Sequence, residues 1–258
     1  MNLNISTLKK SAGSFMLALL LVACSSQRAY QVAGLKGSRT VMTDVYDRHP
    51  DKAMQKFVAG YKVQFDKAMN VQIATSDLSM QSGRPESLLT NLTSDQLKRF
   101  GDNYLKTPCD LAFMNVHGHR AGMPKGVVTL DNLYEIYPFD NTVVLVKLKG
   151  KDLTTLFESY IEMGGAGISS NVRLVGIGGK LHSALVDGKP VDPDKIYTIS
   201  TIDYLADGND GMAAMRNALE VKKTGVALRD MMIDYVKQQT KEGKNLHSQL
   251  DGRILISK

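Results

Sequence analysis

The sequence has 258 residues, of which 43% are hydrophobic and 22% are charged, as in ordinary globular proteins. Its formal net charge is +6, and setting aside Lys9 and Lys10, which lie in an acid-free N-terminal segment, leaves +4. This small excess of positive charge attracts anionic ligands only weakly. No run of Lys or Arg resembles a nucleic-acid-binding segment, so we exclude nucleic acid as a partner. The 235 residues from Cys24 onward are long for one domain and short for two.

The N-terminus carries the features of a secretion signal. Lys9-Lys10 forms a positive region, and the apolar stretch Phe15–Ala23 that follows is too short to cross a bilayer. It ends in Leu21-Val22-Ala23-Cys24, which resembles a bacterial lipobox. We expect a lipoprotein signal peptide over residues 1–23 and an acylated Cys24 that anchors the protein to the cell envelope, extracytoplasmically, without spanning the membrane. An ordinary N-terminal membrane anchor is the alternative. Cys109 then has no disulfide partner and is expected in the core.

Hydrophobic periodicity predicts the elements of the first half of the chain. Residues 24–50 show little periodicity, and we interpret them as the lipidated N-terminus and a lead-in. Helical spacing over Asp51–Met69 predicts an amphipathic helix, and alternation over residues 71–74 predicts a strand. A second helix is expected to begin near Pro85-Glu86 and to run to Tyr104, either unbroken or restarting at Ser94-Asp95. A strand over Asp110–Asn115 then enters a polar turn over residues 116–126.

The second half mixes strands with helices. Expected helices cover residues 131–137, 151–163 and 226–239, and expected strands cover residues 142–148, 171–175, 181–186, 196–202 and 253–256. A Gly-rich stretch, a tight turn at Asp187-Gly188 and a loop over Asp203–Gly211 connect them. No internal repeat or second domain boundary interrupts the pattern, so we expect one α+β domain over residues 51–258.

Three clusters of residues, in this order, carry a family resemblance. They are Asp110–Arg120 followed by Pro124-Lys125-Gly126, then Leu133–Thr142, then Asp203–Gly211, with a weaker fourth match at Gly188–Tyr197. They resemble the strand plus Asn-Gly-Gly-Gly-Ile-Arg loop, the Pro-Phe-x-Asn segment and the aromatic-x-x-x-Gly-Gly-Asp-Gly loop of the C-terminal, substrate-binding domain of 5′-nucleotidases. The resemblance spans roughly residues 84–256 and implies a layered helix–sheet–sheet–helix (α/β/β/α) domain.

The resemblance also implies a nucleotide-binding site. In this family two aromatic rings sandwich the base, and Phe139 and Tyr204 stand at the matching positions; such stacking accepts any base. Asp210 matches the carboxylate that accepts hydrogen bonds from ribose hydroxyls. Arg120 matches the loop arginine, whose fork suits phosphate or sugar oxygens, and Asn115 matches the base-contacting amide. Taken singly, the two aromatic residues are more often core residues, and an aspartate in such a loop is more often a turn-former.

Two of the clusters depart from the family pattern. Val116, His117 and His119 replace two glycines and an isoleucine, and Asn209 replaces a glycine, so we expect added bulk where a ligand would approach the backbone. The two histidines could bind a transition metal, but we expect them to touch the ligand or solvent, and we expect no metal site in this chain. Arg84, just before the second helix, is a further candidate for ligand binding.

Three functional hypotheses follow. In the leading one, this chain recognises the nucleotide in a split 5′-nucleotidase, without a cofactor or catalytic residue of its own, and a separate metallophosphatase chain supplies the divalent metals. It rests on the absence of the family's metal-binding motifs upstream of residue 84. The alternative is a non-catalytic envelope lipoprotein that binds nucleosides or nucleotides or scaffolds other proteins. The third is an autonomous metal hydrolase built on His117 and His119. The sequence thus predicts a hydrolase family but leaves open whether this chain is itself an enzyme.

Overall fold

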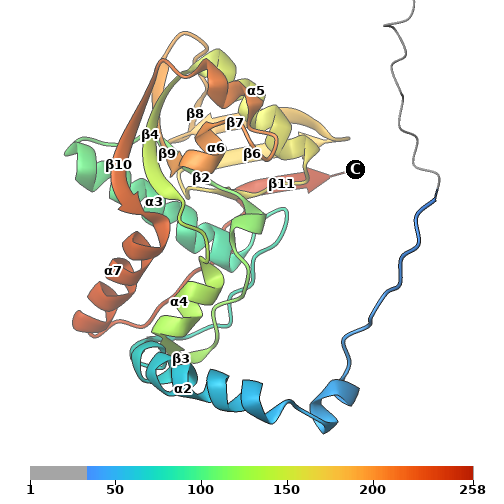
Figure 1. Ribbon diagram of the computed structural model, residues 1–258. Coiled ribbons are helices and arrows are strands. Elements are labelled where there is room, and N and C mark those ends of the chain that lie inside the picture. The colour runs from blue at the N-terminus through green and yellow to red at the C-terminus, as the bar shows by residue number, and fades with distance from the viewer. Residues whose placement is uncertain (1–33, 258) are drawn as a thin grey trace, which may run out of the picture. The chain divides into compact units, whose positions relative to one another are not determined.

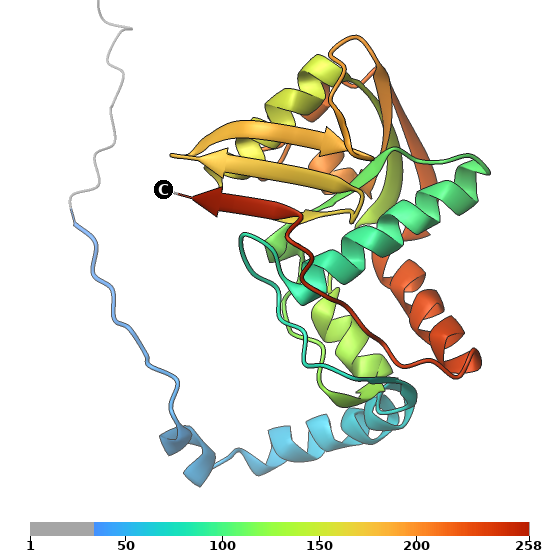
Figure 2. The same ribbon diagram turned by 180° about the vertical axis from the view of Figure 1, so that it is seen from behind.

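The computed structural model describes residues 34–257, which Figures 1 and 2 show from opposite sides. The predicted signal peptide and Cys24 lie outside the described residues. The chain divides into two compact units, residues 1–55 and 56–258. The described part of the first unit contains the short 3-10 helix η1 (Asp44–Arg48) and the first turn of helix α2 (Lys52–Met69). None of the helices in residues 34–257 is long and apolar enough to cross a membrane.

The larger sheet of the second unit has five strands in the order β10-β4-β9-β2-β5. These strands are β2 (Leu111–Met114), β4 (Thr142–Lys149), β5 (Gly167–Ile168), β9 (Ile196–Ile202) and β10 (Glu220–Ala227). Strand β4 pairs antiparallel with both β9 and β10, β2 pairs parallel with β9, and β5 pairs antiparallel with β2. The middle of both β4 and β9 is buried, with Val144 and Ile199 fully buried, which suits a central pair of strands.

A second sheet has four strands in the order β11-β6-β7-β8. They are β6 (Val172–Ile177), β7 (Lys180–Val186), β8 (Lys189–Pro190) and β11 (Ile254–Ser257). Strands β6, β7 and β8 pair antiparallel in chain order, and the closing strand β11 adds parallel to β6. A further pair of strands, β1 (Gln72–Ser76) and β3 (Gly126–Thr129), forms a small antiparallel sheet.

Helices cover these sheets. They are α3 (Leu88–Leu105), α4 (Leu130–Ile136), α5 (Gly150–Glu162), α6 (Asp203–Ala206) and α7 (Leu228–Lys241), with short 3-10 turns η2 (Val116–Gly118) and η3 (Ala213–Asn217). Helix α3 contacts β2, β5 and β9, while α5 contacts β4 and β9 and also β6 and β7 of the second sheet. Phe157 and Tyr160 of α5 pack on Phe113 of β2, with ring centroids 5.9 and 4.9 Å apart. The expected mixed α+β domain is confirmed, and helix α5 packs against both sheets.

Two helices begin at other residues than predicted, and local hydrogen bonds explain the difference. Helix α3 begins at Leu88 rather than near Pro85-Glu86, because the Ser87 hydroxyl caps it by accepting from the Thr90 N–H. From there it runs unbroken to Leu105, without a restart in its middle. Helix α4 begins at Leu130 rather than at residue 131 and is capped by Thr129, because the Thr129 and Asn132 side chains each accept from the other residue's backbone N–H.

Strands β3 and β10 are absent from the sequence-based prediction. The last helix was expected from residue 226, but residues up to Ala227 belong to β10, and α7 begins at Leu228. Strand β10 carries the exposed residues Lys222 and Lys223 and little apolar alternation. It forms because its backbone pairs with the edge of β4, where Val221 lies opposite Val146. Such pairing is a long-range event that leaves only a faint mark on the local sequence.

Cys109 lies in the core, as expected. It is 1% exposed, and its thiol donates to the carbonyl oxygen of Thr198 at 3.2 Å. Burial raises the pKa of the Cys109 thiol to about 12, so the thiol remains protonated. Cys109 therefore acts as a small apolar residue rather than as a reactive thiol.

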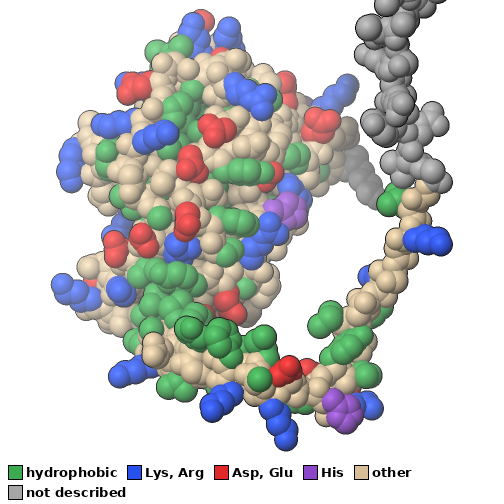
Figure 3. Space-filling model, viewed as in Figure 1, with side chains coloured by type: hydrophobic (Ala, Val, Ile, Leu, Met, Phe, Trp, Pro, Cys, Tyr) green, Lys and Arg blue, Asp and Glu red, His purple; other side chains and the backbone are tan. Residues whose placement is uncertain are grey.

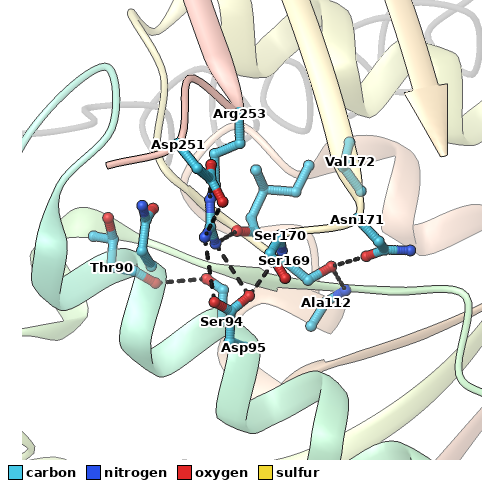
Figure 4. Close-up of polar contacts among 12 residues, drawn as sticks. Thr90, Ser94, Asp95, Ala112, Ser169, Ser170, Asn171, Val172, Asp251 and Arg253 are labelled. Carbon is cyan, nitrogen blue, oxygen red and sulfur yellow. Dashed lines mark hydrogen bonds and ion pairs between the residues drawn. The ribbon is translucent and has the colours of Figure 1, made fainter. Parts of the chain in front are cut away.

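A buried arginine joins the end of the chain to the rest of the domain (Figure 4). Arg253, 2% exposed, donates five hydrogen bonds: two each to the carboxylates of Asp95 on α3 and Asp251 just before β11, and one to the carbonyl oxygen of Ile168 on β5. Burial opposes the charge, but the hydrogen bonds and negative charges of the two aspartates outweigh it and raise the pKa of Arg253. We call Arg253, Asp95 and Asp251 the Arg253 cluster; every guanidinium N–H in it has a partner.

Candidate functional site

The sequence-predicted site residues line one hollow of about 290 Å³. Its lining consists of Asn115, His117, Gly118, Arg120, Phe139, Asn141, Tyr204 and Asp210. All five candidates from the sequence are among them, although they come from three separate loops. His117 was expected to touch ligand or solvent, and two further lining residues, Gly118 and Asn141, were not predicted. Of these, Asn141 stands inside the Pro-Phe-Asp-Asn segment, so the motif itself carried the signal.

The first loop follows strand β2. Asn115 ends the strand and caps η2, with extended backbone angles, and its side chain turns into the hollow. A Cβ atom on Gly118 would overlap the Asn115 amide oxygen and the Met114 side chain, so this position has room only for glycine. The Arg120 backbone N–H donates to the carbonyl oxygen of Ile136, which fixes the end of the loop against α4.

The second loop, Asp203–Gly211, is held at its start by Asp203. This carboxylate accepts from the backbone N–H and the hydroxyl of Thr142 at 3.1 and 2.7 Å, and from the Tyr204 backbone N–H at 2.8 Å. Gly208 and Gly211 have φ of +86° and +78°, and Asp210 between them has φ of +50°. Aspartate tolerates this left-handed region better than most residues, so the loop turns sharply and presents the Asp210 carboxylate to the hollow.

Asp210 connects the two loops through hydrogen bonds. The Asn115 amide donates to one of its carboxylate oxygens at 2.7 Å, and the Tyr204 hydroxyl donates to the other at 3.0 Å. The hydrogen bond to Asp210, with its negative charge, raises the pKa of Tyr204, which keeps the phenol protonated as a donor. The Asn115 amide oxygen is buried and has no hydrogen-bond partner within the described residues.

Two aromatic rings line the hollow while remaining partly open to solvent. Phe139 is 41% exposed and Tyr204 is 40% exposed, so neither is a core residue. The Arg120 guanidinium lies over the Phe139 ring, with its central carbon 5.1 Å from the ring centroid. Asn209 does not line the hollow, and its amide donates to the Tyr204 carbonyl oxygen. The hollow therefore combines aromatic faces, one carboxylate and one guanidinium.

The predictions for the altered loop residues need correction. His119 was expected to touch ligand or solvent, but it is 6% exposed, and its ring nitrogens hydrogen-bond with the hydroxyls of Ser82 and Thr93 at 3.2 and 2.9 Å. Burial lowers the pKa of His119 to about 4, so the ring is neutral at physiological pH. Val116 is also buried, and only His117 adds bulk to the hollow. The expected obstruction is thus confined to one side chain.

Arg84 lies outside the hollow. Its guanidinium donates to the carbonyl oxygen of Gly165, and its side chain lines a different depression with Pro85, Gly164 and Ile256. Arg84 is therefore not brought together with the predicted site residues.

The donor set of this domain does not fit a metal site. His117 faces the hollow, whereas both ring nitrogens of His119 are engaged in the interior, so the two imidazoles do not converge. No group of three or more His, Cys, Asp or Glu side chains within residues 34–257 is arranged to hold a metal ion. The hollow thus offers aromatic faces, hydrogen-bonding groups and one guanidinium.

Comparison with known families identifies this domain. Residues 65–217 match the family model described as 5′-nucleotidase, C-terminal domain, and the chain belongs to this family. The match includes all three loops of the hollow. The relation to 5′-nucleotidases that the sequence motifs implied is therefore confirmed.

Similar proteins include two curated bacterial proteins and one solved bacterial structure. The chain is 24% identical over 200 residues to the protein UshA of Yersinia enterocolitica, covering 74% of this chain and 35% of that protein. It is 29% identical over 139 residues to the UshA protein of Escherichia coli, covering 52% and 25%. A crystal structure of a 5′-nucleotidase precursor from Thermus thermophilus superposes with a TM-score of 0.69 at 25% identity, covering 81% of this chain and 44% of that one. The chain thus spans about a quarter to a third of the length of these two curated relatives.

Proposed function

We propose that the hollow binds the nucleoside part of a nucleotide, with the base stacked between Phe139 and Tyr204. The observation that carries the proposal is the meeting of two half-exposed rings and the Asp210 carboxylate in one small hollow. Aromatic residues left this accessible in a folded domain suit stacking with a planar ligand. Because stacking reads the face of a ring and not its edge, we expect several bases to be accepted.

The polar groups of the hollow suit the sugar and the phosphate. Asp210 is held in place by Asn115 and Tyr204, and each carboxylate oxygen has a second lone pair that could accept from a ribose hydroxyl. Arg120 carries the positive charge on the rim of the hollow, where it could pair with a phosphate. The Arg120 guanidinium covers one face of the Phe139 ring, so a base that stacks on that face displaces it.

We further propose that the domain is the recognition component of extracytoplasmic nucleotide hydrolysis and that a separate metallophosphatase chain supplies the metal ions. Membership of the 5′-nucleotidase family supports a nucleotide as ligand. The hollow contains no set of metal ligands, so its residues supply binding and orientation rather than the attacking hydroxide. Acylation of Cys24 would hold the domain at the envelope membrane.

A second candidate function is a non-catalytic envelope protein that captures nucleosides or acts as a scaffold. The observation that favours it is the cation–π contact between Arg120 and Phe139, together with the hydrogen bonds that already engage Asp210. A ligand that enters the hollow has to replace these contacts between side chains, which weakens its binding. Weak binding without a phosphatase partner would fit this alternative.

A thermal-shift titration of the purified chain with adenosine, AMP and UDP-glucose tests the binding proposal. A ligand that binds only the folded state at a hundredfold excess over its Kd stabilises it by about 2.7 kcal/mol. We expect a shift with at least one ligand and its loss in Phe139→Ala. The control is Tyr104→Ala, which removes an aromatic residue of similar exposure (39%) outside the hollow. If no ligand shifts the transition, or if Phe139→Ala binds as well as wild type, the stacking site is wrong.

The partnership needs its own experiment. Affinity purification of the tagged chain from its native membranes should recover a metallophosphatase, and adding that protein should produce AMP hydrolysis that neither chain shows alone. Phe139→Ala should raise the KM of the reconstituted reaction. Repeated recovery without a metallophosphatase, combined with intact nucleoside binding, would favour the non-catalytic alternative.

A further inference from the structure

Helix α2 presents an apolar face to solvent. Phe57, Val58, Tyr61 and Phe65 are 62%, 50%, 67% and 53% exposed, and Figure 3 shows hydrophobic and basic side chains along this helix at the bottom of the view. The Phe57 and Tyr61 rings contact each other edge-on, with centroids 5.2 Å apart. At 3.6 residues per turn these four positions fall on one side of the helix. A contiguous apolar face of this kind is usually an interaction surface.

The rest of α2 is basic. The helix carries Lys52, Lys56, Lys62 and Lys67 but a single acidic residue, Asp66, so its excess positive charge is three. The Lys62 ammonium pairs with the carboxylate of Asp66 at 3.0 Å, and both side chains are exposed to solvent. Lys52, Lys56 and Lys67 fall on the side of the helix away from the four apolar residues. Any surface that receives the apolar face therefore also meets a positive electrostatic field, which favours a negatively charged partner.

We propose that α2 docks on an anionic lipid surface, with its aromatic face in the interface and its lysines among the head groups. Aromatic residues on one face and lysines on the other are the features of helices that lie in the plane of a membrane interface. Cys24, the predicted acylation site, lies 28 residues before Lys52, and a lipid there would keep α2 near the bilayer. One lipid signal combined with a basic, amphipathic segment gives firmer attachment than either alone.

The proposal is independent of ligand binding in the hollow. It concerns residues of α2, none of which lines the hollow. A failure of nucleotide binding would leave it standing, and failure of membrane docking would leave the nucleotide site standing.

The chain contains no tryptophan, so the fluorescence of a single introduced tryptophan reports only on the position where it is placed. Phe57→Trp is made in the chain with Cys24→Ala, which removes the acylation site. The fluorescence of this variant is followed with vesicles of phosphatidylcholine containing about one quarter phosphatidylglycerol, an anionic lipid. We expect a blue shift and quenching by brominated acyl chains, both weaker at high salt and with pure phosphatidylcholine. Lys56→Gln together with Lys67→Gln should weaken partitioning by about thirtyfold.

A matched control variant shows whether another segment of the chain binds the vesicles. Tyr104→Trp places the reporter on α3 at a residue that is 39% exposed, and its spectrum should stay unchanged with the same vesicles. Equal responses at both positions, or no response at position 57, would overturn the proposal. A blue shift of F57W that needs no lipid and grows with protein concentration would overturn it in favour of a second copy of the chain. A shift seen only with an added metallophosphatase would assign the face to that partner.

Discussion

The Arg253 cluster and the hollow both contain an arginine and at least one aspartate, but these side chains are arranged differently in the two regions. In the Arg253 cluster, two aspartates surround a guanidinium that is 2% exposed, and all its N–H groups have partners (Figure 4). In the hollow, Arg120 contacts a ring rather than a carboxylate, and the rings beside Asp210 are about 40% exposed. The closed cluster has no capacity left for a ligand. The open one keeps aromatic faces and lone pairs available, which is what binding requires.

The largest expected effect is on the closed cluster. Arg253→Ala removes the buried guanidinium that pairs with both Asp95 and Asp251, and losing one partner of a buried ion pair costs about 3–5 kcal/mol. Equilibrium unfolding in urea measures the change. The control is Arg173→Ala, whose half-exposed guanidinium lies 3.9 Å from Asp251 and should contribute less than about 1 kcal/mol. Equal losses in the two variants would mean that burial does not distinguish these arginines.

The second prediction concerns His119, which shares a loop with the hollow but belongs to the interior. Its pKa is lowered by burial from 6.5 to about 4. Between these pH values the unfolded chain binds the extra proton and the folded chain does not, so stability is fully present above pH 6.5 and falls as the pH falls toward 4. The difference corresponds to roughly 3 kcal/mol. Unfolding free energies from pH 7 to 4 should decline less steeply in His119→Gln, which stays neutral. Parallel curves would contradict the buried, neutral state.

The third prediction tests the open region. Phe139→Ala removes one stacking surface, which is worth about 1–3 kcal/mol per base, so we expect nucleoside Kd to rise by about fivefold to a hundredfold. Isothermal titration calorimetry measures it. Stability should change little, because 41% of the ring is already exposed. A variant that loses stability but keeps its affinity would place Phe139 with the structural residues.

The smallest expected effect is at the Tyr204 hydroxyl. Tyr204→Phe keeps the ring and removes the donor that engages Asp210 at 3.0 Å. Without that donor, the Asp210 oxygen has both of its lone pairs, rather than one, open to ribose hydroxyls, and we expect nucleoside affinity to rise by about threefold. Titrations with adenosine and with deoxyadenosine show whether the gain in affinity depends on the 2′-hydroxyl. A loss of affinity would show instead that the Tyr204 hydroxyl orients the carboxylate.

Much of the site could be predicted from the sequence because its residues stand in short motifs. The Pro-Phe-Asp-Asn segment and the loop Asp203–Gly211 each place a ring or a carboxylate next to residues that permit a sharp turn, and these features are local. His119 could not be placed in this way. Whether it faces ligand or interior depends on Ser82 and Thr93, which belong to other segments.

The sequence by itself determined the family, the amphipathic helix α2, the central strands β4 and β9 and the residues of the hollow, because local periodicity and motif spacing encode them. Tertiary structure alone decided the strand β10, the burial of His119 and the Arg253 cluster. The physical reason is sequence separation. Asp251 is a neighbour of Arg253 in the sequence, but Asp95 lies 158 residues away, and an arginine is buried only where enough carboxylates and other acceptors surround it. That convergence is a property of the folded chain, which no local pattern records.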